Sequence, residues 1–288
     1  MSISRASSYL VAIAVFLVSI SQASAAPQAG AIDGAKAIVY KTAGPVELRL
    51  HVFKARGSAP HAAIVFFFGG AWMQGDVAQF APQAKHLAKR GMVAILADYR
   101  VRSRHGTTPF EAMADARSAI RWVRSHAAQL GVDPNRVVAA GGSSGGHLAV
   151  SAAVFDTFDE PGEDTTTSAK PNALVLFNPA VDTSRGGQLF GDRGRDASPL
   201  HHVRAGLPPT LILHGKADTT VPYADVERYC AEAGALGNQC RLVGYDGATH
   251  GFFNQGRGEK WFRETLLEAD RFLTTLGYLP QPAATKIQ

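Results

Sequence analysis

The sequence lacks the residue patterns of metal binding, N-glycosylation and nucleic-acid binding. It contains no H-x-x-x-H pattern and no cluster of cysteine and histidine, and the adjacent His201 and His202 cannot readily converge on one metal ion. No Asn-x-Ser/Thr sequence occurs, so N-glycosylation is not indicated. The formal net charge of +5 is a mild surplus without a nucleic-acid-binding motif. We therefore expect no metal, no other cofactor and no nucleic-acid partner.

Long apolar runs are also scarce. The one near the N-terminus, at 9–20, has about a dozen residues, whereas a membrane span needs about 20. A positively charged start precedes this run, and Ala23, Ser24 and Ala25 form a small-residue cleavage signal. The pattern predicts a secretory signal peptide over residues 1–25, with an uncleaved anchor as the alternative. We expect a secreted or periplasmic protein without a stable membrane anchor.

Only two cysteines, Cys230 and Cys240, are present. Secretion would expose them to an oxidising compartment, where cysteines can pair. A helix predicted over 223–236 contains the first, and a strand predicted over 240–245 begins at the second. A disulfide would therefore join a helix end to a strand start, and two free buried thiols are the alternative.

The remaining chain alternates strand and helix patterns, and it contains 46% hydrophobic residues. Residues 26–288 are enough for one large core, and 281–288 is predicted to be a loose tail. The alternation predicts an α/β fold with a mostly parallel central sheet, helices on both faces and little or no cap domain. Strands are expected at 37–41 and 46–53, which form a hairpin, and at 63–68, 92–98, 173–179, 209–214 and 240–245. Helices are expected at 80–90, 109–130, 223–236 and 264–276, and a surface loop at 157–170.

The segment 137–150, VVAAGGSSGGHLAV, reads as a strand, a sharp turn and a helix. A serine at the tip of such a turn needs small neighbours, because the strand end and helix start approach closely. The G-x-S-x-G pattern fits in two registers, centred on Ser143 or on Ser144. We favour Ser143 as the nucleophile, since the backbone N–H of Ser144 then begins the helix and can face an oxyanion.

An acid and a histidine follow in the order that the α/β-hydrolase scheme requires. Asp218 follows the strand predicted at 209–214, and His250 follows the strand predicted at 240–245. In this interpretation His250 takes the proton of the serine, and Asp218 holds its imidazole in the right tautomer. Asp182 and Asp246 are the rival acids, and we favour Asp218.

A second glycine pair lies where the strand at 63–68 ends. The GGSSGGHLA and HGKADTTVP segments and the GGAW turn resemble those of carboxylesterases related to hormone-sensitive lipase and to bacterial acetyl-xylan and feruloyl esterases. Their turn usually reads H-G-G-G-W or H-G-G-A-W, whereas this chain has Phe68 for the histidine, Ala71 for the third glycine, and Trp72 retained. The resemblance implies that the N–H groups of Gly70, Ala71 and Ser144 form the oxyanion hole. Because backbone groups contact the oxyanion, we expect altered loop support and not loss of activity.

The resemblance also implies the activity. We expect a serine esterase that hydrolyses short acyl esters, such as acetyl esters, on small molecules or plant polysaccharide. Trp72 and Met73 could line the substrate pocket, with ordinary core packing as the alternative. A lipase or serine peptidase of the same fold is the second interpretation, and a non-catalytic binding protein on a hydrolase scaffold is the third. The sequence does not indicate an oligomeric state.

Overall fold

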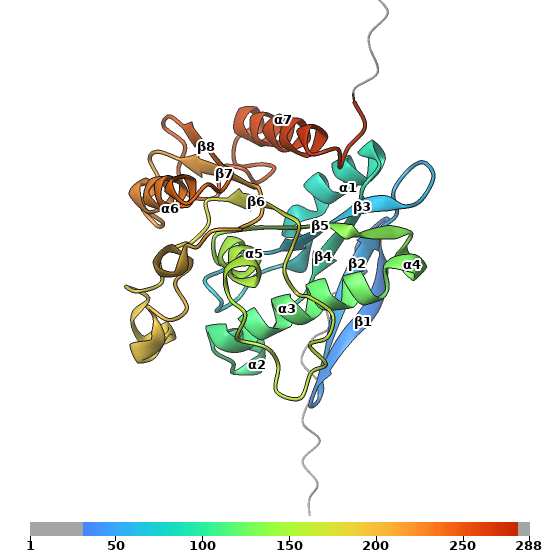
Figure 1. Cartoon of the computed structure of the whole chain (residues 1–288), viewed down its shortest axis with the longest axis horizontal. Helices are drawn as coiled ribbons and strands as arrows, with labels where there is room; N and C mark the ends of the chain where they lie inside the picture. Colours follow the sequence, from blue (N-terminus) through green and yellow to red (C-terminus); the bar gives the residue numbers. More distant parts are fainter. Residues whose placement is uncertain (1–30, 282–288) are drawn as a thin grey trace, which may run out of the picture.

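A computed structural model describes residues 31–281 (Figure 1). The predicted signal peptide and the predicted tail beyond residue 281 lie outside the described residues. The described part is built around an eight-stranded sheet with the strand order β1-β2-β4-β3-β5-β6-β7-β8. The predicted α/β-hydrolase architecture is confirmed.

The first strands form an antiparallel edge, and the rest of the sheet is parallel. β1 (Lys36–Ala43) pairs with β2 (Val46–Phe53), and β2 pairs antiparallel with β4 (Val93–Ala97). The other pairings are parallel and join β4, β3 (His61–Phe67), β5 (Val132–Gly142), β6 (Ala173–Phe177), β7 (Thr210–Gly215) and β8 (Cys240–Tyr245). The carboxyl ends of these parallel strands therefore meet at one edge, where open α/β sheets carry their sites.

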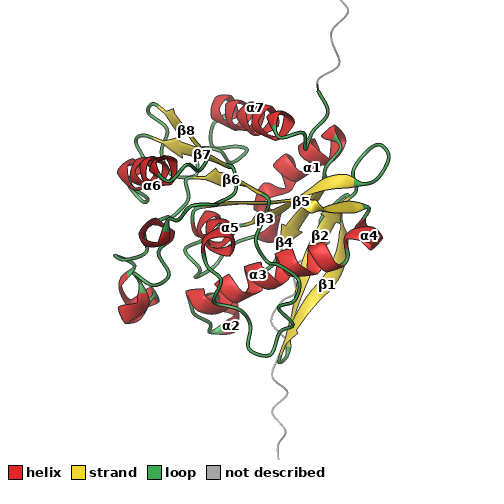
Figure 2. Ribbon diagram, viewed as in Figure 1, coloured by secondary structure: helices red, strands yellow, loops and turns green. Residues whose placement is uncertain are grey.

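Helices cover both faces of the sheet, with α3 and α5 on one face and α1 and α7 on the other (Figure 2). Because both faces are covered, β4 and β6 are short apolar runs in which every residue is buried. The helices are α1 (Ala81–Arg90), α2 (Arg102–His105), α3 (Pro109–Ser125), α4 (Ala127–Leu130), α5 (Ser144–Val154), α6 (Tyr223–Ala235) and α7 (Glu259–Thr275). Short 3₁₀ helices occupy Val77–Phe80 (η1), Gly187–Leu189 (η2), Gly191–Arg193 (η3) and Pro199–His202 (η4).

Two helix predictions are corrected. The helix expected over 109–130 is interrupted at His126, which ends α3 before α4 begins. The His126 ring stacks on Trp122 with 4.0 Å between centroids, and its backbone N–H donates to the Trp122 carbonyl. This backbone bond is the ordinary i to i−4 bond of an α-helix, and the interruption is limited to His126, whose φ of −103° and ψ of 20° depart from helical values. The last helix begins at Glu259, five residues before the expected start at 264, directly after Gly258 with φ 153°.

The loop predicted over 157–170 contains no helix or strand and packs along α3. Arg117 and Arg121 both reach the Asp159 carboxylate at 2.6 Å, and Arg121 also pairs with Glu163 at 2.7 Å. These ion pairs are partly buried, so they fix the acidic loop on the basic face of the helix.

Cys230 of α6 and Cys240 of β8 form a disulfide, with 5.3 Å between their Cα atoms. Of the two alternatives that the sequence left open, the structure contains the bridge. It joins a helix to the strand that follows it at the edge of the sheet.

Candidate active site

Ser143 lies at the tip of a sharp turn between β5 and α5. Its φ of 54° and ψ of −119° are rare for a residue with a side chain. The turn is possible because glycines lie where the end of β5 meets the start of α5: a Cβ at Gly141 would lie 2.4 Å from the Gly145 carbonyl oxygen. The strand end and the helix start therefore touch, and the serine is pushed out toward the carboxyl edge of the sheet.

The structure brings Ser143, His250 and Asp218 together. His250 Nε2 lies 3.0 Å from Ser143 Oγ, and His250 Nδ1 lies 2.7 Å from Asp218 Oδ2. The three residues come from the loops after β5, β8 and β7. This arrangement lets an imidazole exchange a proton with the serine hydroxyl while a carboxylate orients it.

The Asp218 carboxylate is buried and accepts several hydrogen bonds. Its Oδ1 accepts from the backbone N–H groups of Thr220 and Val221, each at 2.9 Å. Its Oδ2 faces His250 and also His214 Nε2 at 3.4 Å. Burial by itself raises the pKa of Asp218, but the hydrogen bonds from His214, His250 and Val221 outweigh it and hold that pKa well below its usual range.

His214 was not predicted to belong to the site. It lies at the end of β7, four residues before Asp218, and is fully buried. Its Nε2 also lies 3.0 Å from the Val221 carbonyl oxygen, so this nitrogen carries the proton. In the sequence, His214 ends an apolar strand. Apart from its being a histidine, nothing in the sequence indicates that it contacts the triad carboxylate.

The rival acids have other partners. Asp182 accepts hydrogen bonds from Ser184 and pairs with Arg185 at 3.2 Å. Asp246 pairs with Lys216 at 2.9 Å, and its side chain is 88% exposed. Neither carboxylate faces His250, whose ring nitrogens contact Ser143 and Asp218.

The turn after β3 has the backbone shape expected for an oxyanion loop. Gly70, Ala71 and Trp72 all have positive φ, at 139°, 55° and 58°. The Gly70 carbonyl accepts from the N–H groups of Met73 at 3.0 Å and Gln74 at 3.1 Å, which closes the turn. Within residues 31–281, the N–H groups of Gly70, Ala71 and Ser144 find no acceptor. They are free to bind an oxyanion.

Phe68 supports this loop through aromatic packing. Its ring stacks on Tyr99 with 4.0 Å between centroids, and the Tyr99 hydroxyl donates to the Phe68 carbonyl at 2.7 Å. Burial raises the pKa of Tyr99 well above its usual range, so the hydroxyl keeps its proton and remains a donor. Phe68 therefore belongs to the packed core beneath the loop.

A cavity of about 360 Å³ opens beside Ser143. Trp72 lines it together with Phe190, which meets the Trp72 ring edge to face at 4.9 Å between centroids. Met73 is not among the lining residues, so its contact with substrate stays a prediction. Phe190 was not predicted, because it comes from the segment after β6, where no sequence pattern indicated a pocket wall. Asp182 and Arg185 of the segment after β6, and Asp225 of α6, also line the cavity.

His147, one turn after Ser143 on α5, supports the cavity from behind. It is fully buried, and its Nε2 lies 2.8 Å from the Ala197 carbonyl oxygen. Its ring meets Trp72 edge to face at 5.1 Å. Burial lowers the pKa of His147 to about 4, so the ring is neutral near pH 7.

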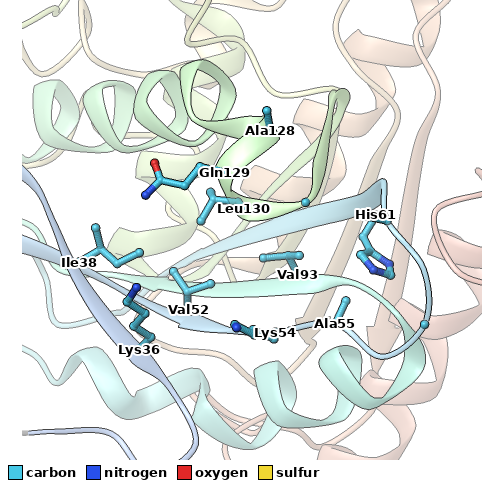
Figure 3. A pocket seen from close by; sticks show the side chains of 13 residues that line it. Lys36, Ile38, Val52, Lys54, Ala55, His61, Val93, Ala128, Gln129 and Leu130 are labelled. Atoms are coloured by element: carbon cyan, nitrogen blue, oxygen red, sulfur yellow. The ribbon is translucent and has the colours of Figure 1, made fainter.

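A second cavity, of about 430 Å³, lies at the opposite, amino-terminal edge of the parallel strands (Figure 3). Lys36, Lys54 and His61 line it, with Leu130 and other apolar side chains. Among residues 31–281, no group of three or more histidine, cysteine, aspartate or glutamate side chains is arranged to hold a metal ion. No helix in this part of the chain combines the length and apolarity needed to cross a membrane.

Comparison with known proteins identifies the family. A family model described as BD-FAE matches residues 50–185, and one for the prolyl oligopeptidase family matches residues 164–270. Esterase 2 of Thermogutta terrifontis, in a structure described as phosphoramylated by tabun, is 47% identical with a TM-score of 0.85, covering 88% of this chain and 98% of that one. Its propionate-bound structure is 47% identical with a TM-score of 0.82, covering 87% and 97%. The chain belongs to the carboxylesterases of the α/β-hydrolase fold.

Curated relatives are more distant and longer. Esterase LipC of Mycobacterium tuberculosis is 30% identical over 221 residues, which are 67% of this chain and 53% of the relative. The probable isoprenylcysteine alpha-carbonyl methylesterase ICMEL1 of Arabidopsis thaliana is 27% identical over 242 residues, 75% of this chain and 50% of the relative. The chain spans about half the length of these curated relatives.

Proposed function

We propose that the protein is a secreted serine esterase that hydrolyses short-chain carboxylic esters through an acyl-enzyme on Ser143. The observation that carries the proposal is the continuous hydrogen-bonded line from Ser143 through His250 to Asp218, beside a cavity that Ser143 itself lines. Family membership supports the reaction class, and the predicted signal peptide supports secretion.

In the first half-reaction, Ser143 Oγ attacks the ester carbonyl carbon and His250 Nε2 takes the hydroxyl proton. The carbonyl oxygen becomes an oxyanion, which the N–H groups of Gly70, Ala71 and Ser144 stabilise. When the tetrahedral intermediate collapses, the bond to the alcohol oxygen breaks, and the alcohol leaves with the proton from His250. Asp218 stabilises the imidazolium while it exists.

In the second half-reaction, water replaces the alcohol. His250 takes a proton from the water as its oxygen attacks the acyl carbon, and the same N–H groups bind the second oxyanion. The bond to Ser143 Oγ then breaks, the serine regains its proton from His250, and the carboxylic acid leaves. No redox step or co-reactant besides water is needed.

The cavity favours a short acyl group. Its volume of about 360 Å³ is near the lower end of ligand pockets, and the rings of Trp72 and Phe190 form an apolar wall. Structures of the Thermogutta terrifontis esterase described as propionate-bound and butyrate-bound agree with an acyl group of this size. We infer that acetyl to butyryl esters are the preferred substrates, and that polysaccharide-borne acetyl groups are candidates because the protein is predicted to be secreted.

The first test is hydrolysis of p-nitrophenyl esters from acetyl to palmitoyl by the mature protein. We expect the highest kcat/KM between acetyl and butyryl and no turnover with Ser143→Ala. Phe190→Ala should move the optimum toward longer chains, because it removes the ring that faces Trp72 in the wall. A wild-type optimum at palmitoyl would contradict the short-chain proposal.

A peptidase activity is the second candidate, since the prolyl oligopeptidase family model matches residues 164–270. The same serine, histidine and aspartate would serve it. Cleavage of p-nitroanilide peptides with ester hydrolysis absent would favour the peptidase. We expect the opposite result, because the 47% identical neighbours are esterases.

A further inference from the structure

Two side-chain amides connect the oxyanion loop to the loop that carries His250. The Gly69 N–H donates to Gln79 Oε1 at 2.7 Å, and Gln79 Nε2 donates to Asn254 Oδ1 at 3.0 Å. Asn254 Nδ2 then donates to the Gly251 carbonyl at 2.9 Å. We call Gln79 and Asn254 the amide bridge.

Both ends of the amide bridge lie next to residues of the proposed chemistry. Gly69 directly precedes Gly70 in the oxyanion loop, and a Cβ at Gly69 would lie 3.4 Å from Ser143 Cβ. At the other end, Gly251 directly follows His250. The bridge therefore joins the N–H donors to the base, although its members are 175 positions apart in the chain.

The direction of each amide is set by the backbone groups at the two ends. A backbone N–H can only donate, so Gln79 must present its oxygen to Gly69 and its nitrogen to Asn254. A backbone carbonyl can only accept, so Asn254 must present its nitrogen to Gly251. Rotating either amide by 180° would place a donor against a donor and an acceptor against an acceptor. The network therefore has one arrangement in which every hydrogen bond is made.

The remaining contacts explain why such a bridge matters in this chain. Phe68 packs on Tyr99 and offers no polar side-chain atom to the loop. The Gly251 N–H is held separately by Asn178 Oδ1 at 3.1 Å. Gln79 is thus the polar side chain that anchors the start of the oxyanion loop, and Asn254 extends that anchor to the histidine loop.

We propose that Gln79 and Asn254 are positioning residues that hold the oxyanion loop and the His250 loop in one fixed relative placement. This role rests on the proposed function. The bridge makes no contact with the reacting atoms in this arrangement; it acts by keeping the N–H donors and the imidazole aligned on the same carbonyl. Small misplacements of such groups lower the rate of the chemical step, and therefore kcat, more than they weaken substrate binding.

Near-isosteric variants test the role. Gln79→Met and Asn254→Leu each break the bridge while preserving volume, and Gln129→Met and Asn135→Leu are matched controls at exposed positions. With p-nitrophenyl butyrate we expect each bridge variant to lower kcat about tenfold with KM within about twofold, and the controls to match wild type. The double variant should also lose about tenfold, because one break already interrupts the connection.

Gln79→Glu distinguishes a connection between the two loops from a hydrogen bond that anchors the oxyanion loop alone. A carboxylate at this position still accepts from Gly69 N–H but cannot donate to Asn254, so we expect it to behave like Gln79→Met. The inhibition constant of butylboronic acid, which forms a tetrahedral adduct with serine, should rise about as much as kcat falls. Thermal melts establish that each variant is folded at the assay temperature.

The outcomes are distinct. Wild-type activity in Gln79→Glu, or a double variant about a hundredfold slower than wild type, would overturn the connection between the loops. Unchanged kcat in both single variants would overturn the positioning role while leaving the esterase proposal intact. An inactive wild type on every ester would instead refute the proposed function itself.

Discussion

Replacing Asp218 by asparagine is the sharpest test of the site, because the surroundings dictate how the new amide must turn. The backbone N–H groups of Thr220 and Val221 donate to Oδ1 at 2.9 Å each. These two donors keep the amide oxygen in that position, so the amide nitrogen must face His250 Nδ1. The nitrogen donates, and His250 must therefore accept at Nδ1 and carry its proton on Nε2.

A proton on Nε2 points at Ser143 Oγ, 3.0 Å away, and prevents the imidazole from taking the hydroxyl proton. The neutral amide also cannot stabilise an imidazolium. For this change in a serine triad the expected loss of kcat is about 10⁴-fold, which corresponds to about 5 kcal/mol in the barrier. Since Asp218 and asparagine have the same shape, KM should change little.

The assay is kcat and KM for p-nitrophenyl butyrate at neutral pH, with Asp246→Asn as the control. Asp246 is exposed and pairs with Lys216 away from the triad, so its variant should match wild type. A loss below about tenfold in Asp218→Asn would refute the assignment. A large loss in Asp182→Asn with an active Asp218→Asn would move the acid to the rival position.

Other predictions follow from the same geometry. Ser143→Ala should abolish ester turnover while Ser144→Ala keeps most of it, since the backbone N–H of residue 144 remains; the reverse result in the same assay would move the nucleophile by one residue. Because the pKa of Asp218 is held well below its usual range, its carboxylate should stay ionised in mild acid, so kcat should show no loss from its protonation near an ordinary aspartate pKa of about 4; a loss of kcat with an apparent pKa of about 4 would contradict that ionisation. Replacing Cys230 and Cys240 by serine should lower the free energy of unfolding by about 2–3 kcal/mol in urea denaturation, with kcat unchanged, since the closed loop is short; equal unfolding curves would show that the bridge contributes no stability.

Much of the fold could be predicted from the sequence because its strands are short apolar runs and its helices have apolar faces. The strand predicted at 240–245 matches β8, and the helix predicted at 223–236 differs from α6 by one residue. The exceptions lie at helix ends: α3 ends before His126, and α7 begins five residues before the predicted start. His126 separates α3 from α4 with a backbone at φ −103° and ψ 20°, and periodicity over 109–130 contains no sign of that break.

The candidate site was predictable to the extent that it depends on local backbone shape. The glycines around Ser143 and those of the oxyanion loop are visible in the sequence because positive φ and close backbone approach favour glycine. Asp218 and His250 were found through their order along the chain. The wall residue Phe190 and the buried His214 were missed, because their roles depend on which surfaces face each other.

The sequence by itself therefore determined the order of elements, the turn at Ser143 and the chain order of the three proposed catalytic residues, since each follows from short-range patterns. Only the tertiary structure decided which carboxylate faces His250, which rings enclose the cavity and how Gln79 meets Asn254. These are contacts between residues far apart in the chain. Their geometry depends on how the strands pair and how the loops pack at one edge of the sheet, which no local pattern specifies.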